Sequence, residues 1–326
     1  MLQIQGISKS YGNQNVLRNF NLDIESGEII SVVGSSGSGK TTLLRLISGL
    51  EMPDNGQITL KDKIVSSDNN FVRPEDRDCS LVFQDYALFP NMSMRQNIYF
   101  GKNSESNKEK IEQLIEITDI ESILEKFPHQ CSGGEQQRVA LVRSLAIDPS
   151  LVLMDEPLSN LDYNLKANLA LVIRDLLKKF KITAIIVTHD IMDAMEMSDR
   201  IIVIDKGEVM QNGLPDELYN NPQSKKIALL FGDTNFIPLE MFPDSKNKFF
   251  DIETNKNWIS IRPNQFSLYD ENLASGKKVF VGKIESIREV ASEHKIELEC
   301  KDLSLKVSLV SQIELSIGQE LKLMAP

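Results

Sequence analysis

The segment EIISVVGSSGSGKTTLLRLISGL, residues 28–50, contains the signals that decide the fold. Its first part, 28–34, is a short, largely β-branched apolar run that ends at a glycine, which predicts a buried parallel strand. Its last part places Leu43, Leu44 and Ile47 at helical spacing. A buried strand that passes through a glycine-rich loop into a helix indicates an α/β core.

The loop between strand and helix matches the phosphate-binding pattern GxxxxGK[ST]. Glycines let backbone N–H groups turn toward phosphate oxygens, and the following helix N-terminus also favours an anion. We expect Lys40 to reach the β- and γ-phosphates and Thr41 to offer its hydroxyl to Mg²⁺. The alternative, a plain glycine-rich turn, needs a chance match with odds on the order of one in a hundred. The matching residues are Gly34, Ser35, Ser36, Gly37, Ser38, Gly39, Lys40 and Thr41.

Further buried strands are predicted by two later apolar runs, 150–156 and 182–190. Between them, 165–180 has the composition and the apolar stripe of a helix. This strand–helix–strand order predicts a parallel sheet. Residues 199–213 then predict two strands joined by a hairpin at 206–207.

Polar residues stand at the ends of both later strands. Asp155 and Glu156 follow the run LVLM, and His189 ends the next strand. Carboxyl ends of parallel strands form the edge where such folds bind ligands, so we expect Asp155 to bind Mg²⁺ and Glu156 to polarise the attacking water. A strand-end cap is the alternative for the carboxylates, and the nearby P-loop argues against it. For His189 a structural role stays open on the residues alone.

A second anion-binding element is predicted at 131–138, CSGGEQQR. It combines a hydroxyl and two glycines with the start of a helix-like run, far along the chain from the P-loop. The alternative is a simple helix N-cap by Ser132.

The C-terminal part has a different pattern of apolar and polar residues. Residues 232–247 are loop-like, and the short alternating runs that follow predict a small all-β barrel or sandwich. We therefore predict two domains, 1–232 and 233–326. The predicted strands lie at 258–263, 277–287, 294–300 and 303–310.

Composition narrows the class of protein. The 326 residues carry a net charge of −11, which argues against broad nucleic-acid binding. The three cysteines, Cys79, Cys131 and Cys300, are too few and too scattered for a disulfide framework or a zinc cluster. No apolar run approaches the roughly 18 residues of a membrane span, and the N-terminus lacks the features of a signal peptide. Any membrane process would be served through a partner.

In these motifs the chain resembles the ABC ATPase family over about 1–232. The motifs follow the family order: the P-loop at 34–41, a Q-loop in VFQDYALFP, the signature SGGEQQR at 132–138, the Walker B run LVLMDE, the D-loop SNLD at 159–162 and a switch histidine. The resemblance implies a P-loop ATPase domain with a parallel core sheet, an antiparallel subdomain and a helical subdomain.

The resemblance also implies how the motifs share ATP and Mg²⁺. Two copies would form a head-to-tail dimer in which each ATP lies between the P-loop of one chain and the signature of the other. The implied ATP-binding residues are Tyr11, which would stack on adenine, Gly34, Ser35, Ser36, Gly37, Ser38, Gly39, Lys40, Thr41 and Thr42. The implied catalytic residues are Glu156, His189 and Gln84, and the metal-binding residues Thr41, Gln84 and Asp155. The signature residues acting in trans would be Ser132, Gly133, Gly134 and Glu135, and Asp162 would link the two sites.

Two residues depart from the family pattern. Cys131 stands where the family usually has Leu, and Glu135 replaces the common Gln. Cys131 is small and apolar enough to pack, and neither change removes a catalytic group. With Glu156 on each copy, both sites of a homodimer would be competent.

Within the family, 78–101 and LMDEPLSNLD are similar to ATPases of binding-protein-dependent importers, and the β segment with IRPNQ resembles their C-terminal OB-like TOBE domain. The nearest branch serves ferric iron, polyamines, sulfate and molybdate, and PEDRDCSLVFQDYALFP looks most like the ferric-iron type. This implies permease partners, indirectly a substrate-binding protein, no nucleic acid, and a peripheral place on the cytoplasmic face of the membrane. Two different classes stay open as alternatives, a soluble non-transport ABC ATPase and a P-loop kinase.

One loop is unusually apolar. Residues 85–100 include Tyr86, Leu88, Phe89, Pro90, Met92 and Met94. We expect a groove for a short permease helix, with local packing under the Q-loop as the alternative.

Overall fold

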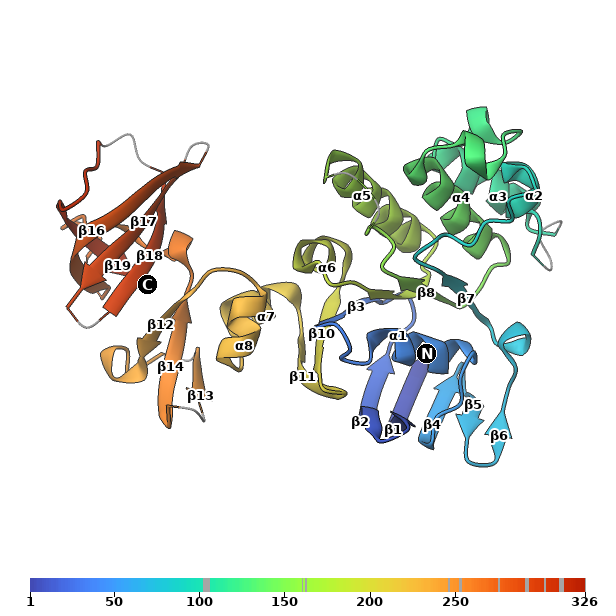
Figure 1. Ribbon diagram of the computed structural model, residues 1–326, viewed down its shortest axis with the longest axis horizontal. Coiled ribbons are helices and arrows are strands. Elements are labelled where there is room, and N and C mark those ends of the chain that lie inside the picture. Colours follow the sequence, from blue (N-terminus) through green and yellow to red (C-terminus); the bar gives the residue numbers. More distant parts are fainter. Residues whose placement is uncertain are drawn as a thin grey trace. The chain divides into compact units, whose positions relative to one another are not determined.

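The computed structural model describes residues 1–326 except 102–105, 160, 162, 246, 252–253, 275, 291–292, 302, 311–313 and 326. The chain divides into two compact units, Met1–Pro215 and Asp216–Pro326 (Figure 1). The expected domain boundary at 232 stays a prediction. Among the described residues, no helix is both long and apolar enough to cross a membrane.

The first unit is built on a six-stranded sheet in the order β11-β10-β3-β9-β8-β7. Five of its strands run parallel in four neighbouring pairs, and only β11 pairs antiparallel, through the predicted hairpin. Each residue of β3 and β9 is buried, as expected for strands covered on both faces. The strands are β3 (Ile29–Gly34), β7 (Cys79–Val82), β8 (Leu151–Asp155), β9 (Thr183–Val187), β10 (Arg200–Asp205) and β11 (Glu208–Gly213).

A second, antiparallel sheet has the order β2-β1-β4-β5-β6. Its strands are β1 (Leu2–Tyr11), β2 (Gln14–Ile24), β4 (Asn55–Leu60), β5 (Lys63–Ser67) and β6 (Asn70–Phe71). Helix α1 (Lys40–Ser48) shares one apolar core with both sheets, since Leu43, Leu44 and Ile47 are buried together with Ile4 and Ile202.

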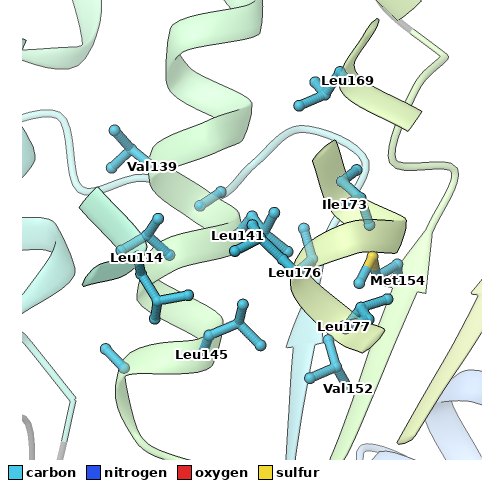
Figure 2. Close-up of a cluster of buried hydrophobic side chains, with 14 of the residues drawn as sticks. Leu114, Val139, Leu141, Leu145, Val152, Met154, Leu169, Ile173, Leu176 and Leu177 are labelled. Atoms are coloured by element: carbon cyan, nitrogen blue, oxygen red, sulfur yellow. The ribbon is translucent and has the colours of Figure 1, made fainter. Parts of the chain in front are cut away.

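Helices α2, α3 and α4 form a helical region beside α5, and α6 packs against α5 and β3 (Figure 1). Apolar side chains of α3, α4, α5 and strand β8 meet in one core, as Figure 2 shows for Leu114, Leu141, Met154 and Leu176. The helices are α2 (Met94–Ile98), α3 (Lys108–Ile117), α4 (Gly133–Ala146), α5 (Tyr163–Lys179) and α6 (Ile191–Met197). Short 3-10 turns lie at Pro74–Asp76, Glu121–Ile123 and Pro128–Gln130.

The range 103–127 is rich in Glu, Lys, Ile and Leu, which predicts a helix, and the structure has a shorter one there. Within the described part of that range, α3 ends at Ile117, and Asp119 has a left-handed φ of 51°. A left-handed residue cannot continue a right-handed helix. The chain therefore turns there and resumes as the short Glu121–Ile123 turn.

The second unit contains the predicted β structure. One sheet has the order β12-β14-β13 and the other β15-β19-β16-β17-β18, and both contribute to one apolar core. The strands are β12 (Asn235–Pro238), β13 (Lys248–Asp251), β14 (Lys256–Ile261), β15 (Ser267–Leu268), β16 (Lys278–Val290), β17 (Glu293–Cys300), β18 (Leu303–Leu309) and β19 (Glu320–Ala325). Two helices, α7 (Pro215–Asn220) and α8 (Lys225–Leu230), precede them, and 3-10 turns lie at Leu239–Met241 and Pro263–Gln265.

A buried arginine organises this unit. Arg262, in the IRPNQ segment, is 1% exposed and donates to the carbonyl oxygens of Tyr219, Ala228, Gly232 and Asp233 at 2.8–3.3 Å. The guanidinium also lies 4.3 Å from the centroid of the Tyr219 ring. These bonds tie both short helices to the end of β14.

Candidate nucleotide-binding site

The P-loop lies between the end of β3 and the start of α1, as predicted. At Gly34 a Cβ atom would lie 2.1 Å from the carbonyl oxygen of Ile204, so no larger residue fits. Gly39, the residue before α1, has a φ of 106°, and a Cβ there would lie 2.7 Å from the carbonyl oxygen of Val16. Glycine is required at both places, for close approach and for backbone conformation.

Lys40 is buried at the start of α1. Its Nζ donates to the carbonyl oxygens of Gly34 at 2.9 Å and Ser35 at 3.1 Å, so the ammonium group lies over the loop. Burial lowers the pKa of Lys40, and the carboxylates of Glu156 and Asp155 oppose that shift. A desolvated cation on this loop is suited to bind phosphate oxygens.

A cavity of about 460 Å³ opens in front of the loop. It brings together P-loop residues, the residues after β8 and β9, and the N-terminal sheet, segments far apart in the sequence. Its lining residues are Gln14, Val16, Ser36, Gly37, Gly39, Lys40, Thr41, Thr42, Glu156 and His189. Gln14 and Val16 carry no motif signal in the sequence and were not predicted.

The residues predicted to bind the metal lie partly together. The Thr41 hydroxyl donates to Oδ1 of Asp155 at 3.3 Å. Burial raises the pKa of the Asp155 carboxyl, and the bond from Thr41 opposes the shift. Hydroxyl and carboxylate oxygens are hard donors of the kind that Mg²⁺ takes, together with waters and substrate phosphates. The donor set therefore fits that ion.

Gln84 makes a different contact. Its Nε2 donates to Oγ of Ser159 at 3.4 Å, and that hydroxyl donates to the carbonyl oxygen of Glu156 at 3.0 Å. Gln84 is exposed and is not among the cavity-lining residues. It is thus joined to the Glu156 segment through Ser159.

Glu156 and His189 face each other across the cavity edge. Nδ1 of His189 lies 3.1 Å from Oε2 of Glu156. Glu156 has a left-handed φ of 48°, and its N–H donates to the carbonyl oxygen of Val187 at 2.8 Å, which fixes this turn against the end of β9. A non-glycine residue held in this conformation costs free energy and is typical of functional turns.

Tyr11 lies at the end of β1 and is not a cavity-lining residue. The residue is 44% exposed, and its hydroxyl donates to Oε2 of Glu51, a partner that no sequence signal indicated. Burial and then the bond to Glu51 raise the pKa of Tyr11, while a hydrogen bond with Thr42 lowers it. The exposed ring is available for stacking beside the Thr42 end of the loop.

The signature begins helix α4. Ser132 is its N-cap: Oγ accepts from the N–H of Glu135 at 3.3 Å, and Oε2 of Glu135 accepts from the N–H of Ser132 at 2.6 Å. This capping box, led by the backbone bond to Ser132, lowers the pKa of Glu135. A Cβ at Gly134 would lie 2.6 Å from Leu165, whereas a Cβ at Gly133 would have no side-chain atom nearer than 3.8 Å. No signature residue lines the cavity in front of the P-loop.

Asp162 lies outside the described residues, so its predicted role in linking two sites stays a prediction. The apolar loop divides into two parts. Tyr86 and Met94 are buried in the helical region, whereas Phe89 is 38% exposed and its ring centroid lies 4.4 Å from that of Phe100. Arg143 fixes this loop, since its guanidinium donates to the carbonyl oxygens of Tyr86 and Ala87.

The site has a buried strand that leads through a P-loop into a helix, and a carboxylate at the end of a neighbouring strand. This arrangement defines a P-loop nucleoside triphosphatase. Comparison with known proteins identifies the group within that class. The family model "ABC transporter" matches residues 17–159. The chain is 35% identical to "Fe(3+) ions import ATP-binding protein FbpC 2" of Haemophilus influenzae over 98% of this chain and 94% of that protein. It is also 35% identical to "Spermidine/putrescine import ATP-binding protein PotA" of Bacillus thuringiensis, over 91% and 86% of the two chains.

Solved structures of ABC cassettes are similar to this chain. The ATP-binding cassette MJ0796, in a dimeric post-hydrolysis state bound to ADP and Pi, has a TM-score of 0.57 at 30% identity, covering 66% of this chain and 99% of that one. CbiO1 from Clostridium perfringens, part of the ABC transporter complex cbiONQ, has a TM-score of 0.60 at 27% identity, covering 67% and 90%. The chain belongs to the ABC transporter family, within which it is an ATP-binding ATPase. The predicted fold class and family are confirmed.

Proposed function

We propose that this chain is the ATP-binding subunit of an ABC importer and hydrolyses Mg²⁺-bound ATP at two composite sites of a head-to-tail homodimer. The observation that carries the proposal is the cavity that joins Lys40, Glu156 and His189 while Ser132 lies elsewhere. One chain thus holds two anion-binding elements but brings only one of them to the cavity. A second copy would supply the other.

The residues of the cavity have different roles in binding ATP, Mg²⁺ and the attacking water. Lys40 and the loop N–H groups bind the β- and γ-phosphates. Thr41 and Asp155 would hold Mg²⁺, which neutralises phosphate charge, and Gln84 would join them when the site closes. Oε2 of Glu156 accepts a hydrogen bond from the attacking water and polarises it, and His189 keeps that carboxylate in place. Ser132, Gly133, Gly134 and Glu135 of the second chain close the site over the γ-phosphate. Tyr11 and Thr42 flank the base and the phosphates, and Asp162 links the two sites.

The partners follow from this role. The chain would act on the cytoplasmic face of the membrane, bound to permease subunits that receive cargo from a substrate-binding protein. Phe89 and the exposed apolar residues around it form the docking surface for a permease helix. We propose that the C-terminal β unit is a TOBE-like domain.

Ferric iron is the proposed cargo. The proposal is supported by the similarity, over nearly the whole length of both chains, to an import protein named for Fe(3+) ions. The relative named for spermidine and putrescine makes polyamines the second candidate. Sulfate and molybdate are further candidate cargoes, and a soluble non-transport ABC ATPase is the candidate from a different class.

Two measurements test the proposal. The purified chain should hydrolyse ATP only with Mg²⁺, and Lys40→Ala should weaken binding of a fluorescent ATP analogue as well as turnover, because the cation on the phosphates is lost. Unchanged affinity and rate in that variant would remove Lys40 from the site. In cells that lack this gene, uptake of radioactive ferric iron should fall while uptake of spermidine, sulfate and molybdate persists. Loss of spermidine uptake alone would assign the chain to polyamines.

A further inference from the structure

Arg77, in the stretch PEDRD, is a buried arginine outside the predicted nucleotide-binding motifs. It follows the short Pro74–Asp76 turn, is 5% exposed, and forms no ion pair with a carboxylate of the described residues. Burial lowers the pKa of its guanidinium, yet the group stays charged because an arginine pKa is far above neutrality. A buried charge of this kind is stable only when its donors are satisfied.

All of its nitrogens are satisfied by oxygens of three segments. Nη1 donates to the carbonyl oxygens of Leu46 at 2.8 Å and Ile47 at 2.7 Å. Nη2 donates to the carbonyl oxygen of Val65 at 3.0 Å and to Oγ of Ser66 at 2.7 Å. Nε donates to the carbonyl oxygen of Val72 at 2.9 Å.

Two of these segments lie in α1 and in the antiparallel sheet, which carry residues of the proposed nucleotide site. Leu46 and Ile47 form the last turn of α1, whose first turn carries Lys40 and Thr41. The carbonyl groups of a last turn lack partners within the helix, and a cation there is favoured by the helix dipole. Val65 and Ser66 lie in β5, in the same antiparallel sheet as Tyr11.

Gly49 makes room for the guanidinium. It is the C-cap of α1 with a φ of 80°, and a Cβ at this position would lie 2.5 Å from Nε and 2.7 Å from Cζ of Arg77. The helix end is therefore shaped around the arginine. Substitution of Gly49 and substitution of Arg77 are therefore two ways to disturb the same contact between the end of α1 and the antiparallel sheet.

We propose that Arg77 is a positioning residue that fixes α1 relative to the antiparallel sheet, and so sets the distance between the phosphate-binding loop and the base-stacking ring of Tyr11. The inference rests on the proposed ATP site. Loss of this contact should leave the P-loop able to bind phosphates, but the loop would no longer lie at the right distance from the ring that stacks on the base. The residue therefore matters for a ligand that has both a base and phosphates, and not for phosphates alone.

The test compares two ligands on the full chain. Arg77→Lys keeps the charge but cannot reach three segments with one nitrogen, and Arg73→Lys, at an exposed arginine of the same loop, is the matched control. Dissociation constants are measured for ATP and for inorganic tripolyphosphate, both with Mg²⁺. Arg77→Lys should raise the constant for ATP roughly tenfold, as expected for a displacement well under 1 Å, and leave that for tripolyphosphate unchanged. The control should change neither.

A second variant keeps the test decisive if Arg77→Lys does not fold. Gly49→Ala leaves the arginine in the chain but strains the left-handed C-cap of α1 and occupies the space of the guanidinium, and it should give the same selective loss for ATP. Equal weakening of both ligands, or no change for either, overturns the inference while the proposed function stands. If the parent chain binds neither ligand, the proposed function fails and the inference falls with it.

Discussion

Nδ1 of His189 lies 3.1 Å from Oε2 of Glu156, at the edge of the cavity in front of the P-loop. The His189 side chain is 64% exposed and the Glu156 side chain 23%, so the carboxylate is the more enclosed of the two. The pair joins the end of β9 to the residue after β8. We propose that this pair holds the carboxylate where it polarises a water next to the γ-phosphate.

Glu156→Gln should therefore bind ATP and lose turnover by about 10²-fold or more, because the amide keeps the shape but not the charge that polarises the water. Trapped ATP should then hold a dimer on size-exclusion chromatography. The matched control is Glu208→Gln, at an exposed glutamate of β11, which should hydrolyse ATP like the parent. Near-normal turnover in Glu156→Gln would exclude Glu156 as the residue that orients the water.

The capping box at the start of α4 predicts a pH dependence. The pKa of Glu135 is lowered from 4.5 in the folded chain by its bonds with Ser132, so the ionised form stabilises the fold. That stability is fully present above the unfolded value of about 4.5 and is lost as pH falls through the lower folded pKa. Glu135→Gln should lower the melting temperature more at pH 7 than at pH 3. An equal difference at both pH values would contradict the charge-dependent capping.

Local signals predicted part of the fold and site, and contacts between distant segments account for the rest. The strand and helix around the P-loop were predictable because glycine positions and apolar periodicity are local signals. The hydroxyl bond from Tyr11 to Glu51 and the bonds of Arg77 were not, because they join segments that only the tertiary fold brings together. The end of α3 depends on one left-handed aspartate, which composition does not indicate. In the proposed dimer, the phosphate partner of Ser132 lies in the second chain.

Phe89 offers a test of coupling to the permease. Its side chain is 38% exposed and packs on Phe100, so truncation removes surface rather than core. Phe89→Ala should leave the ATPase rate of the isolated subunit nearly intact and lower substrate uptake by the assembled transporter. Ile64→Ala, at a similarly exposed apolar residue of β5, should change neither. Equal loss of ATPase rate and uptake in Phe89→Ala would favour packing under the Q-loop.

Arg262 predicts where the second unit is weakest. Arg262→Met would leave four backbone carbonyl groups without their shared donor, at a cost of about 3 kcal/mol. Hydrogen exchange in 216–326 should accelerate roughly a hundredfold, while exchange in the core of the first unit and ATP affinity stay unchanged. Arg288→Met, at an exposed arginine of β16, is the control. Unaltered exchange in Arg262→Met would show that the bonds contribute little.

The composite site is the central claim, and cross-linking between chains tests it most directly. Gly37 has a φ of 76°, so a cysteine there would be strained, and the exposed neighbour Ser36 is the better position. The test uses a chain that carries both Ser36→Cys and Ser132→Cys, with Cys131→Ser to remove the adjacent thiol. It is oxidised with ATP, with ADP or with no nucleotide. The Glu156→Gln change is added to keep ATP bound, and Ser36→Cys alone is the control. We predict a band at twice the 36.8 kDa chain mass on a non-reducing gel, with ATP and not with ADP. No such band with ATP would contradict a site shared between two chains.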